Sequence, residues 1–215
     1  MAFGDPERQQ LLKLWEGSAR VRVLSGPRAI RDDKAVALGR PRQRTLSLHD
    51  HHYLGPDGLP VRHRVIHVIE SLVDGLDRVP YRADTSALTV EVGQGVSGLA
   101  GQVYQPMPGL FVVDMMLSRP LAAGETATLE HWTSFHYTEP PPREFRRIVQ
   151  YSVENLDIRV EFHPARLPSE VVWAVWDGMD GPIAEREPVA LDTQFAVHRY
   201  LRLAEKTVVG FHWDW

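Results

Sequence analysis

The chain has 215 residues, of which 43% are hydrophobic and 24% charged, and such a composition predicts a folded globular protein. There are no cysteines, which excludes disulfides, thiolate nucleophiles, iron–sulfur clusters and zinc sites with cysteine ligands. The net charge of −4 combines +4 over residues 1–50 with −8 over the rest. A mildly basic N-terminal part on an acidic remainder argues against direct binding of nucleic acid, which would require a concentrated basic face.

Residues 1–17 are predicted to form a short N-terminal helix. Asp5, Pro6 and Glu7 are typical of a helix start, with an N-cap, a proline in the first turn and an early acidic residue. An apolar face follows, made of Leu11, Leu12, Leu14 and Trp15. A helix of about three turns is not stable alone in water, so we expect it to pack on the rest of the chain or on a partner.

The first residues show no basic segment followed by an apolar stretch, as a secretory signal would. No window approaches 18 continuous apolar residues, which is the minimum for a membrane-spanning helix. We therefore expect a cytoplasmic protein that does not insert into a membrane.

From residue 18 onward the sequence is typical of β-strands separated by turns. For the segment 61–73 both helix and strand fit the apolar pattern, and its β-branched residues favour a strand. The glycine-rich segment 93–101 and the segment 177–188 are predicted loops. The predicted strands before residue 140 are 20–24, 44–53, 61–73, 88–92, 111–117 and 126–137.

The C-terminal third alternates apolar and polar residues with a period of two, which predicts half-buried strands over 156–162 and 207–215. The segment 171–176 is apolar on both faces and is predicted to be a central strand. The segments 196–203 and 207–215 are interpreted as the two arms of a terminal hairpin. Residues 144–149 are expected to form either a helical turn or the approach to a strand.

These elements predict an all-β fold, namely a mainly antiparallel β-sandwich or open barrel of about nine strands with one short N-terminal helix. We divide the chain into the helix over 1–17 and a single β-sandwich domain over 18–215.

Histidines before the turn at 55–58 suggest a metal site. His49 and His51 share one face of the predicted strand, whereas His52 lies on the other. Two histidines at i and i+2 can bind one metal ion if a neighbouring strand supplies a third ligand. The pattern is similar to the His-x-His of cupins, but the spaced glycine and glutamate of that family are absent. The alternative is a polar strand end without a metal.

Aromatic and histidine residues suggest a ligand-binding surface. Trp132 shares a predicted outer face with His136, and an aromatic ring among polar neighbours indicates either a second packing layer or a binding surface. Trp176 precedes a loop that contains two glycines. His131 lies on the apolar face of its strand, where a core histidine is the alternative to a ligand. We take Trp132, His136, Trp176 and His131 as the candidate ligand-binding residues.

Four stretches resemble a β-rich region that follows the DNA-binding domain in actinobacterial regulators of the XRE helix-turn-helix type. The resemblance covers most of residues 11–215 and implies kinship with a regulatory module, while only about ten residues precede it, too few for a helix-turn-helix domain. The stretches that carry it are His51–Gly58, Leu72–Arg78, Asn155–Pro164 and Gly210–Trp213.

The sequence contains neither a Gly-x-Ser-x-Gly hydrolase motif nor a complete dinucleotide fingerprint. We therefore expect a non-catalytic, sensor-like module of a bacterial regulatory or accessory system that binds a small molecule or a protein partner, without a cofactor unless a metal is bound. One alternative is a cupin-like or β-barrel metal-dependent enzyme that uses a histidine cluster. Another is a structural subunit that self-associates into a homo-oligomer.

Overall fold

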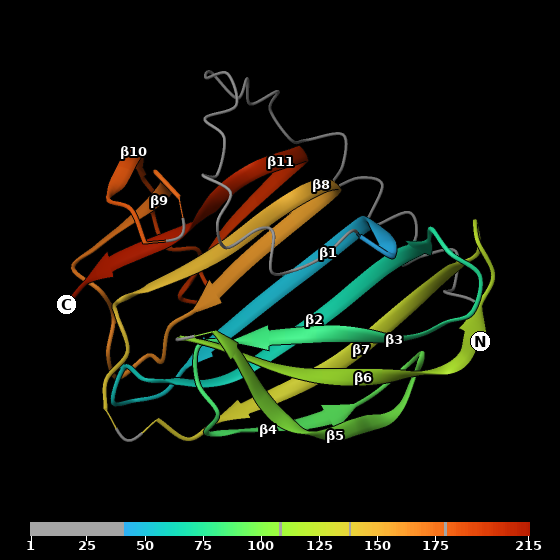
Figure 1. Cartoon of the computed structure of the whole chain (residues 1–215). Coiled ribbons are helices and arrows are strands. Elements are labelled where there is room, and N and C mark those ends of the chain that lie inside the picture. Colours follow the sequence, from blue (N-terminus) through green and yellow to red (C-terminus); the bar gives the residue numbers. More distant parts are fainter. Residues whose placement is uncertain (1–40, 108, 138, 179) are drawn as a thin grey trace.

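The structure is a computed structural model and describes residues 41–215 except 108, 138 and 179. The described residues form eleven β-strands and no helix, which confirms the prediction of an all-β fold (Figure 1). The strands are β1 (Gln43–Leu54), β2 (Pro60–Ser71), β3 (Leu76–Ala83), β4 (Leu88–Val92), β5 (Val96–Met107), β6 (Leu110–Leu121), β7 (Thr126–Phe135), β8 (Glu144–Glu161), β9 (Glu170–Trp176), β10 (Ile183–Pro188) and β11 (Ala196–Asp214).

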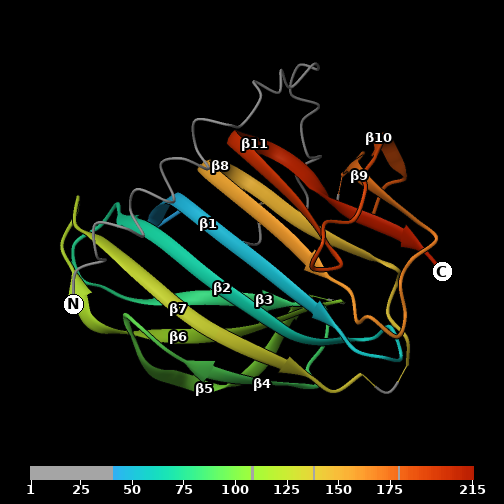
Figure 2. The same cartoon turned by 180° about the vertical axis from the view of Figure 1, so that it is seen from behind.

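The strands form two sheets. The larger sheet has the order β10-β9-β11-β8-β1-β2-β7-β4, and the smaller sheet has the order β3-β6-β5 (Figures 1 and 2). Neighbouring strands are antiparallel except for β1 and β8, which are parallel. The larger sheet is therefore mixed, and the described part of the fold is mainly antiparallel, as expected.

Three of the eleven strands were not predicted: β3 was not among the predicted strands, and β5 and β10 correct predicted loops. Strand β5 begins within the glycine-rich segment, where its pairing with β6 shifts register three times. Strand β10 is an edge strand with almost entirely exposed side chains. Neither β5 nor β10 needs an alternating apolar face, and that face is the signal by which strands are predicted.

The predicted terminal hairpin is wrong, because residues 196–214 form the single strand β11. Residues 196–212 pair with β8, and residues 208–214 pair with β9. The break in the sequence pattern near residue 205 corresponds to a register shift between Glu205 and Thr207. Lys206 within the shift and Leu203 just before it have positive φ angles. Such a bulge bends a strand without reversing it.

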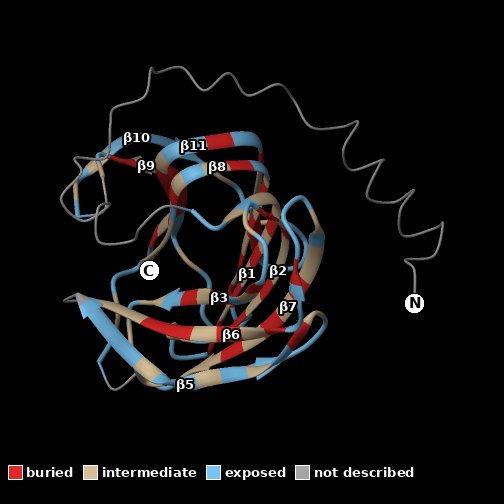
Figure 3. Ribbon diagram, turned by 45° about the vertical axis from the view of Figure 1, so that its right-hand side comes forward, coloured by how far each residue is buried: buried red, intermediate tan, exposed pale blue. Residues whose placement is uncertain are grey.

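The two sheets pack face to face, in a sandwich-like arrangement. Tyr81 on β3 contacts the rings of His63 on β2 and His131 on β7. The largest fully buried side chains of the described residues come from both sheets, and Figure 3 shows buried positions on β1, β2, β6 and β7. The apolar core includes Ile69, Leu76, Val79, Met115, Leu129, Leu156, Ile158, Val160, Phe162 and Phe211.

The segment predicted as a helical turn or strand approach, 144–149, is the first part of β8. This part does not lie beside β1 in the sheet but covers its inner face, where the ring of Phe145 packs against His52 at a centroid distance of 3.8 Å. The strand β9 is buried on both faces, as predicted for a central strand, and it lies between β10 and β11.

The predicted helix over residues 1–17 and the predicted strand over 20–24 lie outside the described residues. Within the described part, the chain contains no helix that is long and apolar enough to cross a membrane.

Candidate metal centre

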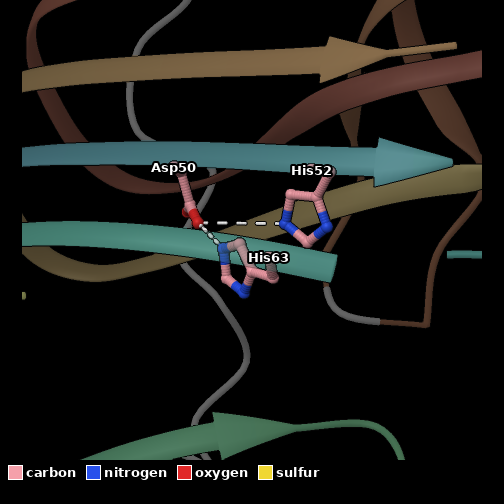
Figure 4. Close-up of side chains that lie close together, drawn as sticks. All are labelled: Asp50, His52 and His63. Atoms are coloured by element: carbon pink, nitrogen blue, oxygen red, sulfur yellow. Dashed lines mark hydrogen bonds and ion pairs between the residues drawn. The ribbon is translucent and has the colours of Figure 1, made fainter. Parts of the chain in front are cut away.

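The inner face of the β1–β2 hairpin carries three titratable side chains that meet in the core (Figure 4). Asp50 and His52 are two residues apart on β1 and therefore point to the same face. His63 on β2 is the direct partner of His52 across the antiparallel pair. All three residues are buried, with exposed fractions of 0% for Asp50, 8% for His52 and 3% for His63.

The Asp50 carboxylate is shared among three side chains. Its Oδ1 accepts a hydrogen bond from His63 Nε2 and lies 3.8 Å from His52 Nε2, whereas its Oδ2 forms an ion pair with Arg147 from β8. Burial opposes ionisation of this carboxyl group, but the charge of Arg147 and the hydrogen bond from His63 outweigh burial and hold its pKa far below the usual value. Asp50 is therefore a buried carboxylate anion at neutral pH.

The two histidines are stacked and neutral. Their ring centroids are 3.8 Å apart with an interplanar angle of 22°. Burial is the main cause that lowers the pKa of both imidazoles, and for His52 the neighbouring His63 lowers it further. Because an ionised carboxylate only accepts hydrogen bonds, His63 Nε2 carries the proton, and His63 Nδ1 accepts from the Tyr81 hydroxyl at 3.1 Å.

His52 Nε2 is buried and has no hydrogen-bond partner among the described residues. Such an atom is costly to leave unpaired, because its desolvation is not compensated. The atom lies 3.8 Å from Asp50 Oδ1, the same carboxylate oxygen that accepts the hydrogen bond from His63.

The three groups fit a transition-metal ion. Their ligand atoms all lie within 4.8 Å of one another, and two imidazoles with one carboxylate are a common ligand set for zinc and related divalent ions. Two of the three ligands also have a second partner that would orient them. Arg147 holds the other oxygen of Asp50, and Tyr81 holds the other nitrogen of His63, as outer partners of metal ligands do.

Two further histidines lie on the same inner face. The predicted ligand-binding residue His131 is 1% exposed, contacts the Tyr81 ring edge-on at 4.7 Å, and has no partner on either nitrogen among the described residues. Burial lowers the pKa of His131 to about 3. His67 bonds to Thr45 Oγ1 at 2.8 Å, and burial lowers its pKa to about 4. Both imidazoles are neutral at pH 7.

The other predicted ligand-binding residues lie elsewhere. Trp132 is on the outer face of β7, where Tyr53 stacks on its ring at 6.0 Å and the guanidinium groups of Arg62 and Arg64 lie 4.1 and 5.2 Å from its centroid. His136 is exposed just after β7.

Trp176 is buried at the end of β9, beneath Arg146, whose guanidinium carbon lies 4.8 Å from the ring centroid. Four strands separate β9 from β7 in the sheet, so the structure does not bring Trp176 together with Trp132.

The predicted metal ligands His49 and His51 share the outer face of β1, as expected, and two residues from distant parts of the sequence join them. Asp157 on β8 lies 2.9 Å from His49 Nδ1 and 3.7 Å from His51 Nε2 through its Oδ2, and its Oδ1 accepts a hydrogen bond from His198 on β11. The residue pattern of β1 could not identify Asp157 or His198, because it does not specify which strands lie beside β1 in the sheet.

The inner group was missed, although the sequence held a signal for it. A hairpin centred on the turn at 55–58 places His52 opposite His63, and the alternation of β1 then puts Asp50 on the same face. His67 shares this face of β2 with His63 but contacts a different residue, Thr45.

Comparison with known proteins identifies no family. No family model matches the chain, and no curated protein matches it. Among solved structures, the chain is similar to a crystal structure from Parabacteroides distasonis described as a "putative protease", with 9% sequence identity and a TM-score of 0.49. The match covers 79% of this chain and 40% of the other, so this chain spans less than half the length of that protein.

Proposed function

We propose that this chain is a non-catalytic metal-binding module in which Asp50, His52 and His63 bind one divalent transition-metal ion of the zinc class. The observation that carries the proposal is the convergence of one carboxylate oxygen and one nitrogen of each imidazole within 4.8 Å in the core. An ion in this position would give His52 Nε2 the partner that it lacks.

The local chemistry supports neutral ligands. Imidazole binds a metal in its neutral form, and burial already keeps His52 and His63 neutral. Metal binding at His63 Nε2 would move its proton to Nδ1, which would then donate to the Tyr81 oxygen instead of accepting from it. The hydrogen-bonded pair thus accommodates both states of His63.

Burial supports binding without catalysis. A catalytic metal needs an open coordination position that a substrate can reach. Here Phe145 and Tyr81 pack against the histidine rings, and the three ligands are almost completely buried. The proposal agrees with the sensor-like module that the sequence suggested, and the bound ion would link β1 to β2.

The test compares zinc binding by the wild-type chain and by His52→Phe. Phenylalanine preserves the stacking on His63 and Phe145 but removes the unpaired Nε2. We expect metal-free His52→Phe to be as stable as the wild type. Zinc at about 100 times its Kd should stabilise the wild type by about 2.7 kcal/mol through the inner site. The His52→Phe variant should lack this contribution.

The matched control is His163→Phe, because His163 is exposed beyond the end of β8. Its zinc content, measured by native mass spectrometry after removal of free metal, should equal that of the wild type. Equal zinc content and equal stabilisation in wild type and His52→Phe would refute the proposal.

A further inference from the structure

Three adjacent strands place a second cluster of metal-ligating side chains on the outer face of the larger sheet. Asp157 on β8 is the direct register partner of His49 on β1 and of Tyr200 on β11. His51 is two residues from His49, and His198 is two residues from Tyr200. Both histidines therefore share the face of Asp157. Three imidazoles thus surround one carboxylate, on the side of the sheet opposite to Asp50 and His52.

Two of the distances within the cluster are close to the spacing of two ligand atoms around a small ion. Two ligand atoms about 2.1 Å from a tetrahedral metal are about 3.4 Å apart. Asp157 Oδ2 lies 2.9 Å from His49 Nδ1 and 3.7 Å from His51 Nε2, and Oδ1 contacts His198 Nε2 directly. Each imidazole therefore already turns a nitrogen toward the carboxylate.

We propose that His49, His51, Asp157 and His198 form a second, solvent-accessible site for a divalent transition-metal ion of the zinc class. Among the described residues, only the inner group has all its ligand atoms within 4.8 Å of one another, so the outer group closes around an ion by rotation of its imidazoles. The side chain of His198 is 47% exposed and has room to rotate.

The neighbours of the cluster suit a cation. Ser47 Oγ lies 3.2 Å from His49 Nε2, and it can accept the proton that this nitrogen would carry when Nδ1 binds a metal. Arg159 is the register partner of both His51 and His198 and shares their face, but its guanidinium donates to Asp192 and Gln194 at 3.1 and 2.9 Å. Its charge is thus paired outside the cluster.

The outer site differs from the inner site in access. Exposed fractions of 30% for His49 and 25% for His51 leave the cluster open to solvent, so an ion can enter without opening of the core and can retain a water ligand. The outer site therefore suits an exchangeable ion, whereas the inner site suits a permanently bound one. This inference does not depend on the inner site.

The test counts the zinc ions bound by the full chain. Proteins are loaded with zinc chloride, desalted and examined by native mass spectrometry, and affinities are measured by competition with a chelator. We expect two ions in the wild type, one in His51→Ala/His198→Ala, one in His52→Phe, and none in the triple variant. The outer affinity should fall about 100-fold or more in the double variant, because two ligands are lost.

The matched control is His136→Ala/His163→Ala, which removes two exposed histidines outside both clusters and should keep two ions. Asp157→Asn serves as a second variant that keeps all histidines and should also lose the outer ion.

The inference is overturned if His51→Ala/His198→Ala retains the zinc count and affinities of the wild type, or if the wild type binds no zinc. A wild type with one ion that is lost in this variant, but not in His52→Phe, supports the outer site and refutes the inner one. The reverse pattern refutes the outer site.

Discussion

Arg147 and Asp50 form an ion pair although their positions in the sheet would place them far apart. The register partner of Asp50 on β8 is Ile158, eleven residues beyond Arg147, and a straight strand would separate the two positions by about 36 Å. The ion pair therefore requires β8 to fold back over β1. The bulge and positive φ angles of β11 allow the paired strand to follow this bend.

Removal of the Arg147 charge should destabilise the fold. In Arg147→Met the Asp50 carboxylate stays buried without its cation, and loss of one partner of a buried pair costs about 3–5 kcal/mol. The free energy of unfolding, measured with urea, should fall by that order. The addition of Asp50→Asn should recover much of the loss, because no buried charge remains.

Arg186→Met on the exposed edge strand β10 is the control for this substitution, with an expected change within about 0.5 kcal/mol. Equal stability of Arg147→Met and Arg186→Met would show that the ion pair contributes nothing.

Acid should destabilise the protein through His131. Its pKa is about 3 in the folded chain, below the value of about 6.5 expected when unfolded. The unfolded chain therefore binds the extra proton first, so stability is complete above pH 6.5 and is lost as pH falls toward 3. One such proton contributes a slope of about 1.4 kcal/mol per pH unit.

The measurement is urea unfolding between pH 4 and 7 in the presence of a chelator. His131→Phe should reduce the slope by about one proton, whereas exposed His136→Phe should leave it unchanged. An unaltered slope in His131→Phe would mean that another group takes up the proton.

Gly95 and Gly101 allow backbone strain to be separated from steric conflict. Both have positive φ, at 74° and 72°, so alanine is strained at either position by about 1–2 kcal/mol. A Cβ at Gly95 would lie 2.1 Å from the Thr128 carbonyl oxygen, whereas one at Gly101 meets nothing within 4 Å. Gly95→Ala should therefore destabilise the protein clearly more than Gly101→Ala in parallel urea titrations. Equal losses would contradict the proposed clash.

Trp132 should stabilise the outer face through its two arginines. Trp132→Leu removes both cation–π contacts, each of which contributes about 0.5–1 kcal/mol at an exposed site. The free energy of unfolding should fall by about 1–2 kcal/mol, and Trp132→Phe should lose less. The loss in free energy of unfolding caused by Trp132→Leu should become smaller when it is measured in the Arg62→Met/Arg64→Met background. An equal loss in both backgrounds would show that the arginines are not the cause.

The sequence predicted those parts of the fold that depend on local alternation. Leu156, Ile158 and Val160 are fully buried, as their spacing indicated. Long-range pairing was not predictable, because the parallel neighbour of β1 begins about 100 residues later and no local pattern specifies it. For that reason His49 and His51 were found, but Asp157 and His198 were not. The strand β10 was missed because it has no apolar face, and so no alternating pattern marks it in the sequence.

The position of β1 between β2 and β8 also constrains the order of folding. Its hairpin partner β2 is available as soon as residue 71 has been synthesised, but its second edge stays unpaired until β8 follows. Contacts so distant in sequence are formed slowly, and an unpaired central strand can associate with other chains in the meantime. We expect slow refolding that is sensitive to protein concentration, with aggregation through the open edge of β1 as the competing process.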